Sequence, residues 1–279
     1  MPTPRVAAIH DMSGFGRCSL TVAIPVLSAM GVQCCPLPTA YLSTHTGGFT
    51  GYTFLDMTDE LPKTAAHWAE LGIHFDAVYT GFMGSEAQMD LAADFVRTFR
   101  RDRSTIFICD PVMGDHGRMY RGLAPEMVPA MYTLCSRASL ILPNTTEAAL
   151  LLGDPMPGVT GEAELHTAQT QAQRLTRICP RVLITGVAAG RGIACVGADR
   201  ATGESLVRTP MVPKSFHGTG DIFGAVLVGR LLQGNVLPAA AQAAAVFVAD
   251  CLKATPDEAD ERLGVWLESV LPQLMQNPE

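Results

Sequence analysis

The chain has 279 residues, a hydrophobic fraction of 48% and a formal net charge of -7. This length and apolar content allow one large α/β domain or two smaller ones, each with a buried core. The sequence contains no block of like charges and no basic stripe, so we expect no nucleic-acid partner. It also contains no visible signal peptide and no run of 18 apolar residues, so we expect no membrane span and a cytoplasmic location.

The eight cysteines are scattered through apolar segments and form no Cys-x-x-Cys pair. Such cysteines are typical of small buried residues in a reducing cytosol. The neighbouring residues Cys34 and Cys35 are not expected to form a metal or redox site, because adjacent side chains on a strand point to opposite faces.

Short apolar runs alternate with helical stretches along the chain. In chain order, the first part predicts a strand at 6–10, a helix at 19–30, an extended segment at 33–38, a helix at 60–71, a strand at 77–80, a helix at 86–101 and a strand at 105–110. The second part predicts a helix at 126–135, a strand at 140–142, a helix that starts at 144, a helix at 162–178, a strand at 182–185, a hairpin of 193–196 with 204–208, and helices at 220–233, 238–253 and 260–274. This alternation predicts an α/β fold with a parallel sheet covered on both faces. Because no linker or repeat interrupts it, we expect a single domain over residues 1–279.

Polar residues and glycines gather directly after the predicted strands. These clusters occupy residues 10–13, 81–84, 110–115, 143–144 and 185–186. Ligands of open α/β sheets bind beyond the carboxyl ends of the strands. We therefore expect the functional site at this edge of the sheet.

The segment Phe216–Asp221 is the strongest local signal, because it opens an apolar helix with the run Gly-Thr-Gly-Asp. Glycines let backbone N–H groups approach an anion closely, and a helix N-terminus offers unpaired donors with a partial positive charge. A carboxylate at Asp221 is placed to take a proton from a hydroxyl beside a bound phosphate. On local grounds alone, the alternative is that Asp221 only caps the helix.

Several other polar residues each allow two interpretations. Asp110 precedes Pro111 and is either a turn residue or a carboxylate that faces a metal ion. Asn144 and Glu147 have the spacing of a capping box, and the alternative is that Glu147 orients water on Mg²⁺. The loop Thr44–Gly48 is either a glycine-rich turn or a set of hydroxyls and an imidazole that binds a polar heterocycle.

Together these motifs resemble the ribokinase-like superfamily, and within it the pyridoxal, pyridoxine and pyridoxamine kinases. The motifs that carry the resemblance are Ser43–Gly47, Gly81–Ser85, Asp110–Asp115, Pro143–Asn144 with Glu147, and His217–Asp221. Their order along the chain makes the set much more specific than any one motif. The resemblance implies a doubly wound three-layer sandwich with a mostly parallel central sheet.

The resemblance also implies an enzyme that phosphorylates the 5′-hydroxymethyl group of vitamin B6 vitamers. Asp221 would be the base that deprotonates this group. The anion hole for the transferred phosphoryl group would be formed by Gly218, Thr219 and Gly220. The pyridine ring of the substrate would lie near Asp11, Ser13, Thr46 and Phe82.

For the second substrate, the resemblance implies ATP together with Mg²⁺. Asp110 and Glu147 would help to place the metal ion. The residues implied in ATP binding are Asp110, Asn144, Thr185, Gly186 and Tyr120. The loop Asp115–Tyr120 resembles a flexible segment that closes over ATP and excludes water. A homodimer is also implied, and the resemblance leaves open whether a monovalent cation activates the enzyme.

Two departures from the family pattern concern the substrate. Asp11 stands where many pyridoxal kinases have a serine, and Phe82 stands where a tyrosine is common. We expect the Asp11 carboxylate to pair with the pyridinium or phenolic group of the ring, or with the aminomethyl group of pyridoxamine. The run Asp11–Gly14 is also similar to hydroxymethylpyrimidine kinases, so hydroxymethylpyrimidine (phosphate) kinase is the nearest alternative.

Two alternatives lie further away. A sugar or nucleoside kinase of the same superfamily is disfavoured, because such enzymes carry a small lid sheet for which residues 11–58 leave no room. A non-catalytic vitamer-binding protein is disfavoured by the intact run Gly218–Asp221, because a pure binder needs no base there.

Overall fold

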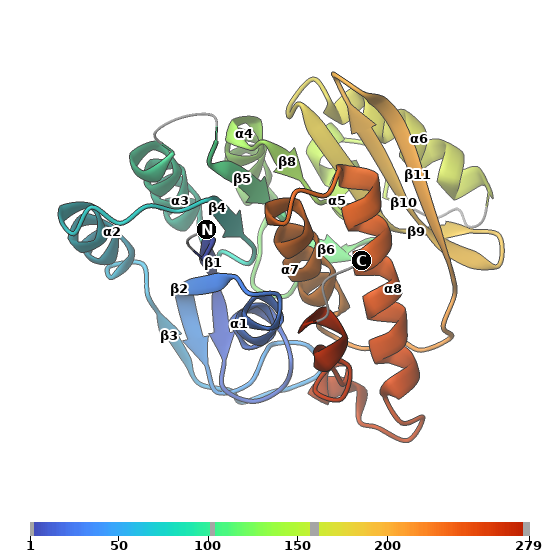
Figure 1. The fold of residues 1–279 in the computed structure, drawn as a ribbon, viewed down its shortest axis with the longest axis horizontal. Helices are drawn as coiled ribbons and strands as arrows, with labels where there is room; N and C mark the ends of the chain where they lie inside the picture. Colours follow the sequence, from blue (N-terminus) through green and yellow to red (C-terminus); the bar gives the residue numbers. More distant parts are fainter. Residues whose placement is uncertain (1–2, 101–103, 157–161, 276–279) are drawn as a thin grey trace. The chain divides into compact units, whose positions relative to one another are not determined.

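A computed structural model of the chain describes residues 3–100, 104–156 and 162–275. The chain divides into two compact units, the first made of Met1–Val78 and Val212–Glu279 and the second of Tyr79–Met211. The first unit therefore combines both ends of the sequence, drawn in blue and in orange to red in Figure 1. The expectation of a single domain over residues 1–279 stays a prediction.

The sheet of the first unit begins with a strand that is buried along almost its whole length. The strands are β1 (Arg5–Ser13), β2 (Gln33–Leu42) and β3 (Phe54–Asp56). β1 pairs in parallel with β2, and β3 pairs antiparallel with β2. β1 runs past the predicted end at His10, because a register shift between His10 and Met12 lets the pairing continue to Ser13. Asp11 and Ser13 thus belong to the strand itself.

The helices of the first unit pack on its sheet or on one another. They are α1 (Ser19–Ala29), α2 (Leu61–Glu70), α7 (Thr219–Leu232) and α8 (Leu237–Ala254). α1 contacts β1 and β2, α7 packs on α1, and α8 packs on α7, as Figure 1 shows. The residues Ile222–Gly229 of α7 are all buried, so packing fixes the part of the helix that follows its first turn.

Among the described residues, α8 is the one helix that is long and apolar enough to cross a membrane by length and composition. The side chains of α8 that are buried within the first unit are Leu237, Ala240, Ala241, Ala244, Phe247 and Cys251. Asp250 and Lys253 form an ion pair of 2.8 Å on the same helix. Because α8 packs on α7, its buried side chains belong to the core of the first unit. The expectation that the chain has no membrane span stays a prediction.

The helix predicted over residues 260–274 is wrong. The chain instead forms two short 3-10 turns, η2 (Glu261–Leu263) and η3 (Leu271–Met275). Gly264 directly after η2 has a φ of +76°, which turns the chain out of the helical path. Pro272 lies near the start of η3, where its ring and missing N–H prevent a helix from continuing through it.

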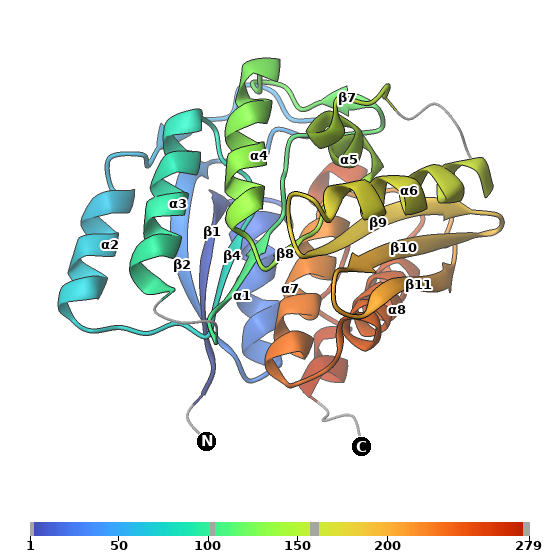
Figure 2. The same cartoon turned by 90° about the horizontal axis from the view of Figure 1, so that it is seen from above.

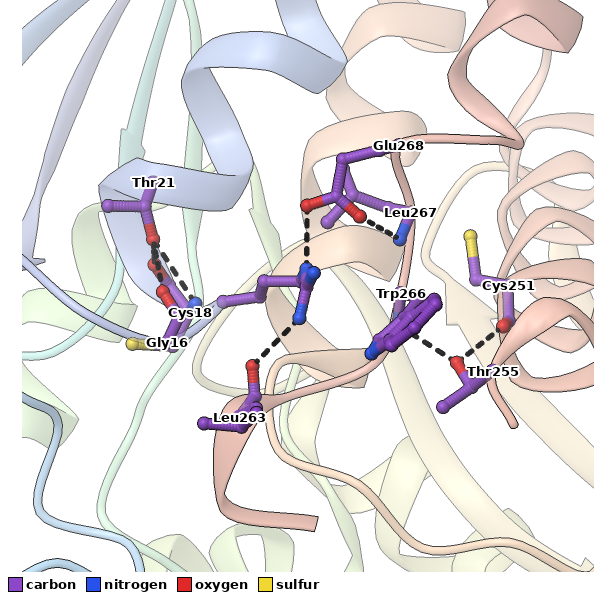
Figure 3. A network of polar contacts seen from close by, with 10 residues as sticks. Gly16, Cys18, Thr21, Cys251, Thr255, Leu263, Trp266, Leu267 and Glu268 are labelled. Atoms are coloured by element: carbon purple, nitrogen blue, oxygen red, sulfur yellow. Dashed lines mark hydrogen bonds and ion pairs between the residues drawn. The ribbon is translucent and has the colours of Figure 1, made fainter. Parts of the chain in front are cut away.

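A polar network fixes this C-terminal segment to the rest of the first unit (Figure 3). The buried Thr255 hydroxyl donates to the Cys251 carbonyl at 2.8 Å and accepts the Trp266 N–H at 2.9 Å. The Arg17 guanidinium stacks over the Trp266 ring and pairs with Glu268 at 2.6 Å. The segment thus has a defined path although it is not helical.

The sheet of the second unit is parallel in its middle and antiparallel at one end. Its strand order is β11-β10-β9-β8-β5-β4, with β4 (Ala77–Thr80) as the strand at which the chain enters this unit. The other strands are β5 (Ile106–Cys109), β8 (Leu140–Ile141), β9 (Arg181–Ala189), β10 (Gly192–Asp199) and β11 (Gly203–Pro210). β5, β8 and β9 are parallel, and the predicted hairpin is confirmed as antiparallel β10 and β11.

The helices of the second unit agree with prediction to within a few residues. They are α3 (Glu86–Phe99), α4 (Val128–Arg137) after the 3-10 turn η1 (Pro125–Met127), α5 (Thr145–Leu152) and α6 (Glu162–Leu175). α6 lies over β9 and β10, as Figure 2 shows. A small hairpin of β6 (Gly114–Asp115) and β7 (Arg118–Met119) was not predicted. The predicted α/β fold class with a mostly parallel sheet is confirmed.

Candidate active site

Asp221 lies in the first turn of α7, directly after a backbone turn that requires glycine. Gly218 precedes the helix with a φ of +85°, a conformation that residues with a side chain rarely adopt. A Cβ atom on Gly218 would also collide with the carbonyl oxygen of Arg17, whereas a Cβ atom on Gly220 would meet nothing within 4 Å. Thr219 is half-buried and Gly220 is exposed. The first N–H groups of α7, which have no partner within the helix, therefore start from a fixed turn.

The environment of Asp221 suits a general base. Burial raises the pKa of Asp221 to about 7, and the negative charge of Asp11 acts in the same direction. The backbone N–H of Ser19 faces the Asp221 carboxylate and lowers this pKa. A base whose pKa lies near the working pH combines the deprotonated form with a strong pull on a proton.

Asp11 is buried on β1, and both of its carboxylate oxygens are engaged. One oxygen accepts the Ser19 hydroxyl at 2.5 Å, and the other accepts the Ser13 hydroxyl at 3.2 Å. Only 6% of Asp11 is exposed. Burial raises the pKa of Asp11, while the two hydroxyl groups lower it. The structure thus places Asp11 and Ser13 on one strand near Asp221, and their roles toward a substrate stay a prediction.

Ser19 was missed by the sequence analysis, although it links the two carboxylates. Its hydroxyl donates to Asp11, and its N–H faces Asp221. Its φ is +47°, and among the described residues only His116 shares a positive φ without being glycine. No local pattern of residues marks a serine for this conformation, so only the folded chain reveals it.

The loop Thr44–Gly48 lies beside the residue that precedes Gly218. The His45 ring accepts the Gly47 N–H at 3.1 Å through Nδ1 and donates from Nε2 to the Arg262 carbonyl at 2.6 Å. These bonds engage both ring nitrogens of His45 and fix the orientation of the ring. The His45 and His217 rings are 4.9 Å apart, and a Cβ atom on Gly47 would collide with the His217 ring. Half-buried Thr46 is therefore held near the start of α7.

The C-terminal segment holds the same loops in place. The Arg17 N–H donates to the Leu263 carbonyl at 3.1 Å, and the Val265 N–H donates to the His217 carbonyl at 3.1 Å. The sequence analysis missed this role because it predicted a helix here.

In the second unit, Asn144 and Glu147 form the capping box at the start of α5, so that interpretation is confirmed. Glu147 is 2% exposed and accepts the N–H groups of Met113 at 3.0 Å and Asn144 at 2.9 Å. Burial raises the pKa of Glu147 to about 8, while these backbone amides lower it. Its carboxylate therefore fastens the segment after β5 to α5.

Residues assigned to ATP lie after the carboxyl ends of β5 and β8 and in the middle of β9. Asp110 is half-buried directly after β5, and its N–H donates to the Thr80 carbonyl at 2.9 Å. Asn144, which follows β8, forms a parallel bridge with Thr185 in the middle of β9. Gly186 follows in an exposed position with a φ of +70°.

The loop predicted to cover ATP is the β6–β7 hairpin. The Tyr120 N–H donates to the Met113 carbonyl at 2.9 Å, and the Gly117 N–H donates to the Thr146 hydroxyl at 2.9 Å. Tyr120 itself is 39% exposed. Phe82, the remaining predicted substrate residue, is half-buried after β4 in the same unit.

The donor set fits a magnesium ion only if phosphate completes it. Among residues 3–100, 104–156 and 162–275, no group of three or more His, Cys, Asp or Glu side chains is placed to hold a metal ion. Mg²⁺ usually takes one or two carboxylates and fills its other positions with waters and substrate phosphates. Asp110 supplies a carboxylate of this kind after β5, whereas both oxygens of Glu147 are already bonded to backbone N–H groups.

Comparison with known proteins covers almost the whole chain. Residues 22–265 match the family model of phosphomethylpyrimidine kinase. A pyridoxine/pyridoxal/pyridoxamine kinase of Bordetella pertussis is 30% identical over 271 residues, which cover 90% of this chain and 89% of the relative. A solved structure of pyridoxal kinase from Lactobacillus plantarum is 32% identical, with a TM-score of 0.88 over 98% of this chain and 97% of that one.

A second solved structure is closer in sequence. It is a Bacteroides thetaiotaomicron protein, provisionally assigned as a phosphomethylpyrimidine kinase and crystallised with pyridoxal. It is 40% identical to this chain, with a TM-score of 0.92 over 100% of this chain and 98% of that one. The fold expected from the motifs is therefore found in solved structures over the full length of the chain.

Proposed function

Because the chain belongs to the phosphomethylpyrimidine kinase family, we propose that it transfers the γ-phosphoryl group of ATP to the 5′-hydroxymethyl group of pyridoxal, pyridoxine and pyridoxamine. The observation that carries the proposal is the half-buried Asp221 at the glycine-bounded start of α7. The choice of substrate is supported by the Bordetella relative, which is named for these vitamers, and by the Bacteroides structure with pyridoxal.

Asp221 would act as the general base. As the substrate oxygen attacks the γ-phosphorus, its proton passes to the Asp221 carboxylate, and the bond between the γ-phosphorus and the leaving oxygen of ADP breaks. The pKa of about 7 lets Asp221 hold this proton after transfer and release it at neutral pH. We therefore expect kcat to rise with pH through this region on its acidic side.

The turn Gly218–Gly220 would bind the transferred group. Phosphoryl transfer spreads negative charge over the equatorial oxygens, and backbone N–H groups at a helix N-terminus stabilise that charge without having to reorganise. Because Gly218 adopts a left-handed φ and packs against the Arg17 carbonyl, the donors are set before the substrate binds.

Residues of the second unit would bind ATP and its metal ion. Asp110 would hold Mg²⁺, which when bound neutralises charge on the phosphate oxygens. Glu147, with both oxygens bonded to backbone N–H groups, would support the site without binding the ion directly. Asn144 and Thr185 would contact the phosphates, with Gly186 and Tyr120 as further contacts. The N–H groups of Met113 and Asn144 donate to Glu147, and these two bonds hold the segment after β5 against the start of α5. Activation by a monovalent cation stays open.

The substrate ring would contact Ser13, Thr46 and Phe82, and a direct contact to Asp11 stays a prediction. A second candidate function is hydroxymethylpyrimidine (phosphate) kinase, which is favoured by the description of the matching family and by the run Asp11–Gly14. It is the weaker candidate, because the relatives and the pyridoxal complex point to the pyridine ring. Both reactions use the same hydroxymethyl chemistry.

We also propose a cytoplasmic homodimer. All eight cysteines are free, which suits a reducing compartment. On the first unit, Tyr41, Phe54 and Leu55 are exposed on the paired strands β2 and β3, and a second copy would shield this apolar edge. Light scattering on the purified protein measures the oligomeric state, and a monomer at micromolar concentration would contradict the dimer.

The function is tested by turnover with ATP and Mg²⁺ on pyridoxal, pyridoxine, pyridoxamine and hydroxymethylpyrimidine. The proposal predicts phosphorylation of the vitamers and its loss in Asp221→Ala. Selective turnover of hydroxymethylpyrimidine would support the second candidate. Vitamer binding without turnover of any of these compounds would identify a non-catalytic binding protein.

A further inference from the structure

We propose that Asp11 and Ser19 are positioning residues for the base: Asp11 holds the Ser19 hydroxyl, and Ser19 presents its backbone N–H to the Asp221 carboxylate. The inference rests on the proposed function and adds a specific arrangement to it. It also gives Asp11 a role other than contact with the substrate.

The position of Asp11 favours this role. Its carboxylate is 6% exposed, and its two oxygens accept the Ser19 hydroxyl at 2.5 Å and the Ser13 hydroxyl at 3.2 Å. A carboxylate that is buried and already bonded at both oxygens has little capacity left for a ligand. Its strongest contact, judged by length, is the one to Ser19.

The backbone of Ser19 needs such a contact. Its φ of +47° is a conformation that residues with a side chain rarely adopt, and it persists only where the surroundings impose it. The bond from the Ser19 hydroxyl to Asp11 anchors the residue on the β1 side, and its N–H faces Asp221 on α7. The strained residue therefore connects a buried strand to the base.

The charge of Asp11 acts on Asp221 as well. The groups that face Asp221 are Asp11 from β1 and the N–H of Ser19 from α1, and Cys18 at the start of α1 is affected by both carboxylates. His45 from the 44–48 loop acts on Asp11. On α8, which packs against α7, Asp250 is paired with Lys253. Asp11 is thus the charged neighbour that makes proton uptake by Asp221 more favourable.

The first test is the pH profile of kcat for Asp11→Asn, which keeps the shape of the side chain and removes its charge. We expect kcat to fall at least several-fold for pyridoxal, pyridoxine and pyridoxamine alike, and the acidic limb to move down by about one pH unit. Asp76→Asn is the matched control, because Asp76 accepts the N–H of Arg5 at the other end of β1. It should keep the wild-type profile.

The second test does not depend on activity. In protein labelled with ¹³C at the aspartate carboxyl carbon, with Asp221→Asn to assign the resonance, the titration of Asp221 should move to lower pH in Asp11→Asn. Ser19→Ala should move it in the same direction, because Asp11 loses the hydroxyl bond that favours its charged form. This variant serves if Asp11→Asn fails to fold.

The outcomes separate the two proposals. An unchanged Asp221 titration in the folded variants would overturn the inference, whatever the enzyme does. A loss confined to pyridoxamine, with an unshifted pH profile, would also overturn it and would restore Asp11 as a substrate contact. A wild-type protein that phosphorylates no vitamer would defeat the proposed function, while the carboxyl titration would still test the link between Asp11 and Asp221.

Discussion

Asp221→Asn should stabilise the protein at pH 8 while it removes most of the activity. Burial raises the pKa of Asp221 from its ordinary value of 3.8 to about 7. Below pH 3.8 the carboxyl is protonated in both the folded and the unfolded chain, so it contributes nothing to the pH dependence. Between these values the unfolded chain loses the proton that the folded protein keeps, so stability falls as pH rises. Above pH 7 the full penalty is present.

The magnitude follows from the shift. A difference of about 3 pKa units corresponds to about 4 kcal/mol of unfolding free energy. Asp221 is partly exposed, and Asn is a weaker acceptor than a carboxylate for the Ser19 N–H, so we expect a gain of roughly 2–4 kcal/mol at pH 8. For a chain of this size, that gain corresponds to a rise in Tm of roughly 5–10 °C. The same substitution, Asp221→Asn, should lower kcat by roughly 10²-fold or more.

The assay is thermal unfolding of wild type and Asp221→Asn at intervals from pH 4 to pH 8. The stability advantage of the variant should be small near pH 4 and should grow up to about pH 7. Asp76→Asn makes the same charge change at an exposed site and should follow the pH dependence of the wild type. The reasoning is refuted if Asp221→Asn differs from wild type by the same amount at every pH, or is less stable at pH 8.

Three further changes test other parts of the account. Gly218→Ala should destabilise the protein by roughly 2–4 kcal/mol in urea unfolding and abolish turnover, because Gly218 has a positive φ and its Cβ would collide with the Arg17 carbonyl. The control Gly220→Ala should leave the unfolding midpoint unchanged. Equal midpoints for the two variants would contradict this expectation. Glu147→Gln should lower the free energy of unfolding by roughly 1–3 kcal/mol and raise KM for ATP more than KM for pyridoxal, because one backbone N–H loses its acceptor. An unchanged KM for ATP in steady-state kinetics would argue against the placement of Glu147 at the ATP site. Chelation of Mg²⁺ with EDTA should stop turnover and leave pyridoxal binding to the free protein intact by calorimetry; activity that survives chelation would remove the metal ion from the account.

Features that depend on local sequence were predicted well. The capping box of Asn144 and Glu147 follows from side chains that reach backbone groups three residues away, so its spacing alone identifies it. The β10–β11 hairpin follows from two apolar runs around a polar turn. The glycine before α7 was identified by its motif, and the left-handed φ of Gly218 supplies the reason.

Features that depend on distant contacts were missed. The positive φ of Ser19 is stabilised by the bond to Asp11 on β1, and this contact is not visible from the residues around Ser19. The extension of β1 to Ser13 depends on a register shift against β2. The C-terminal segment is different, because Gly264 and Pro272 are local signals against a helix that outweigh its apolar pattern.

The central claim is that Asp221 is the base that directs phosphoryl transfer to the 5′-hydroxymethyl group of a B6 vitamer. The most direct measurement is mass spectrometry and ³¹P NMR of the product from pyridoxal, ATP and Mg²⁺, with wild type and Asp221→Asn run side by side. The account predicts pyridoxal 5′-phosphate from the wild type and a rate at least roughly 10²-fold lower from the variant. Similar rates for both proteins, or no phosphorylated pyridoxal from the wild type, would contradict it.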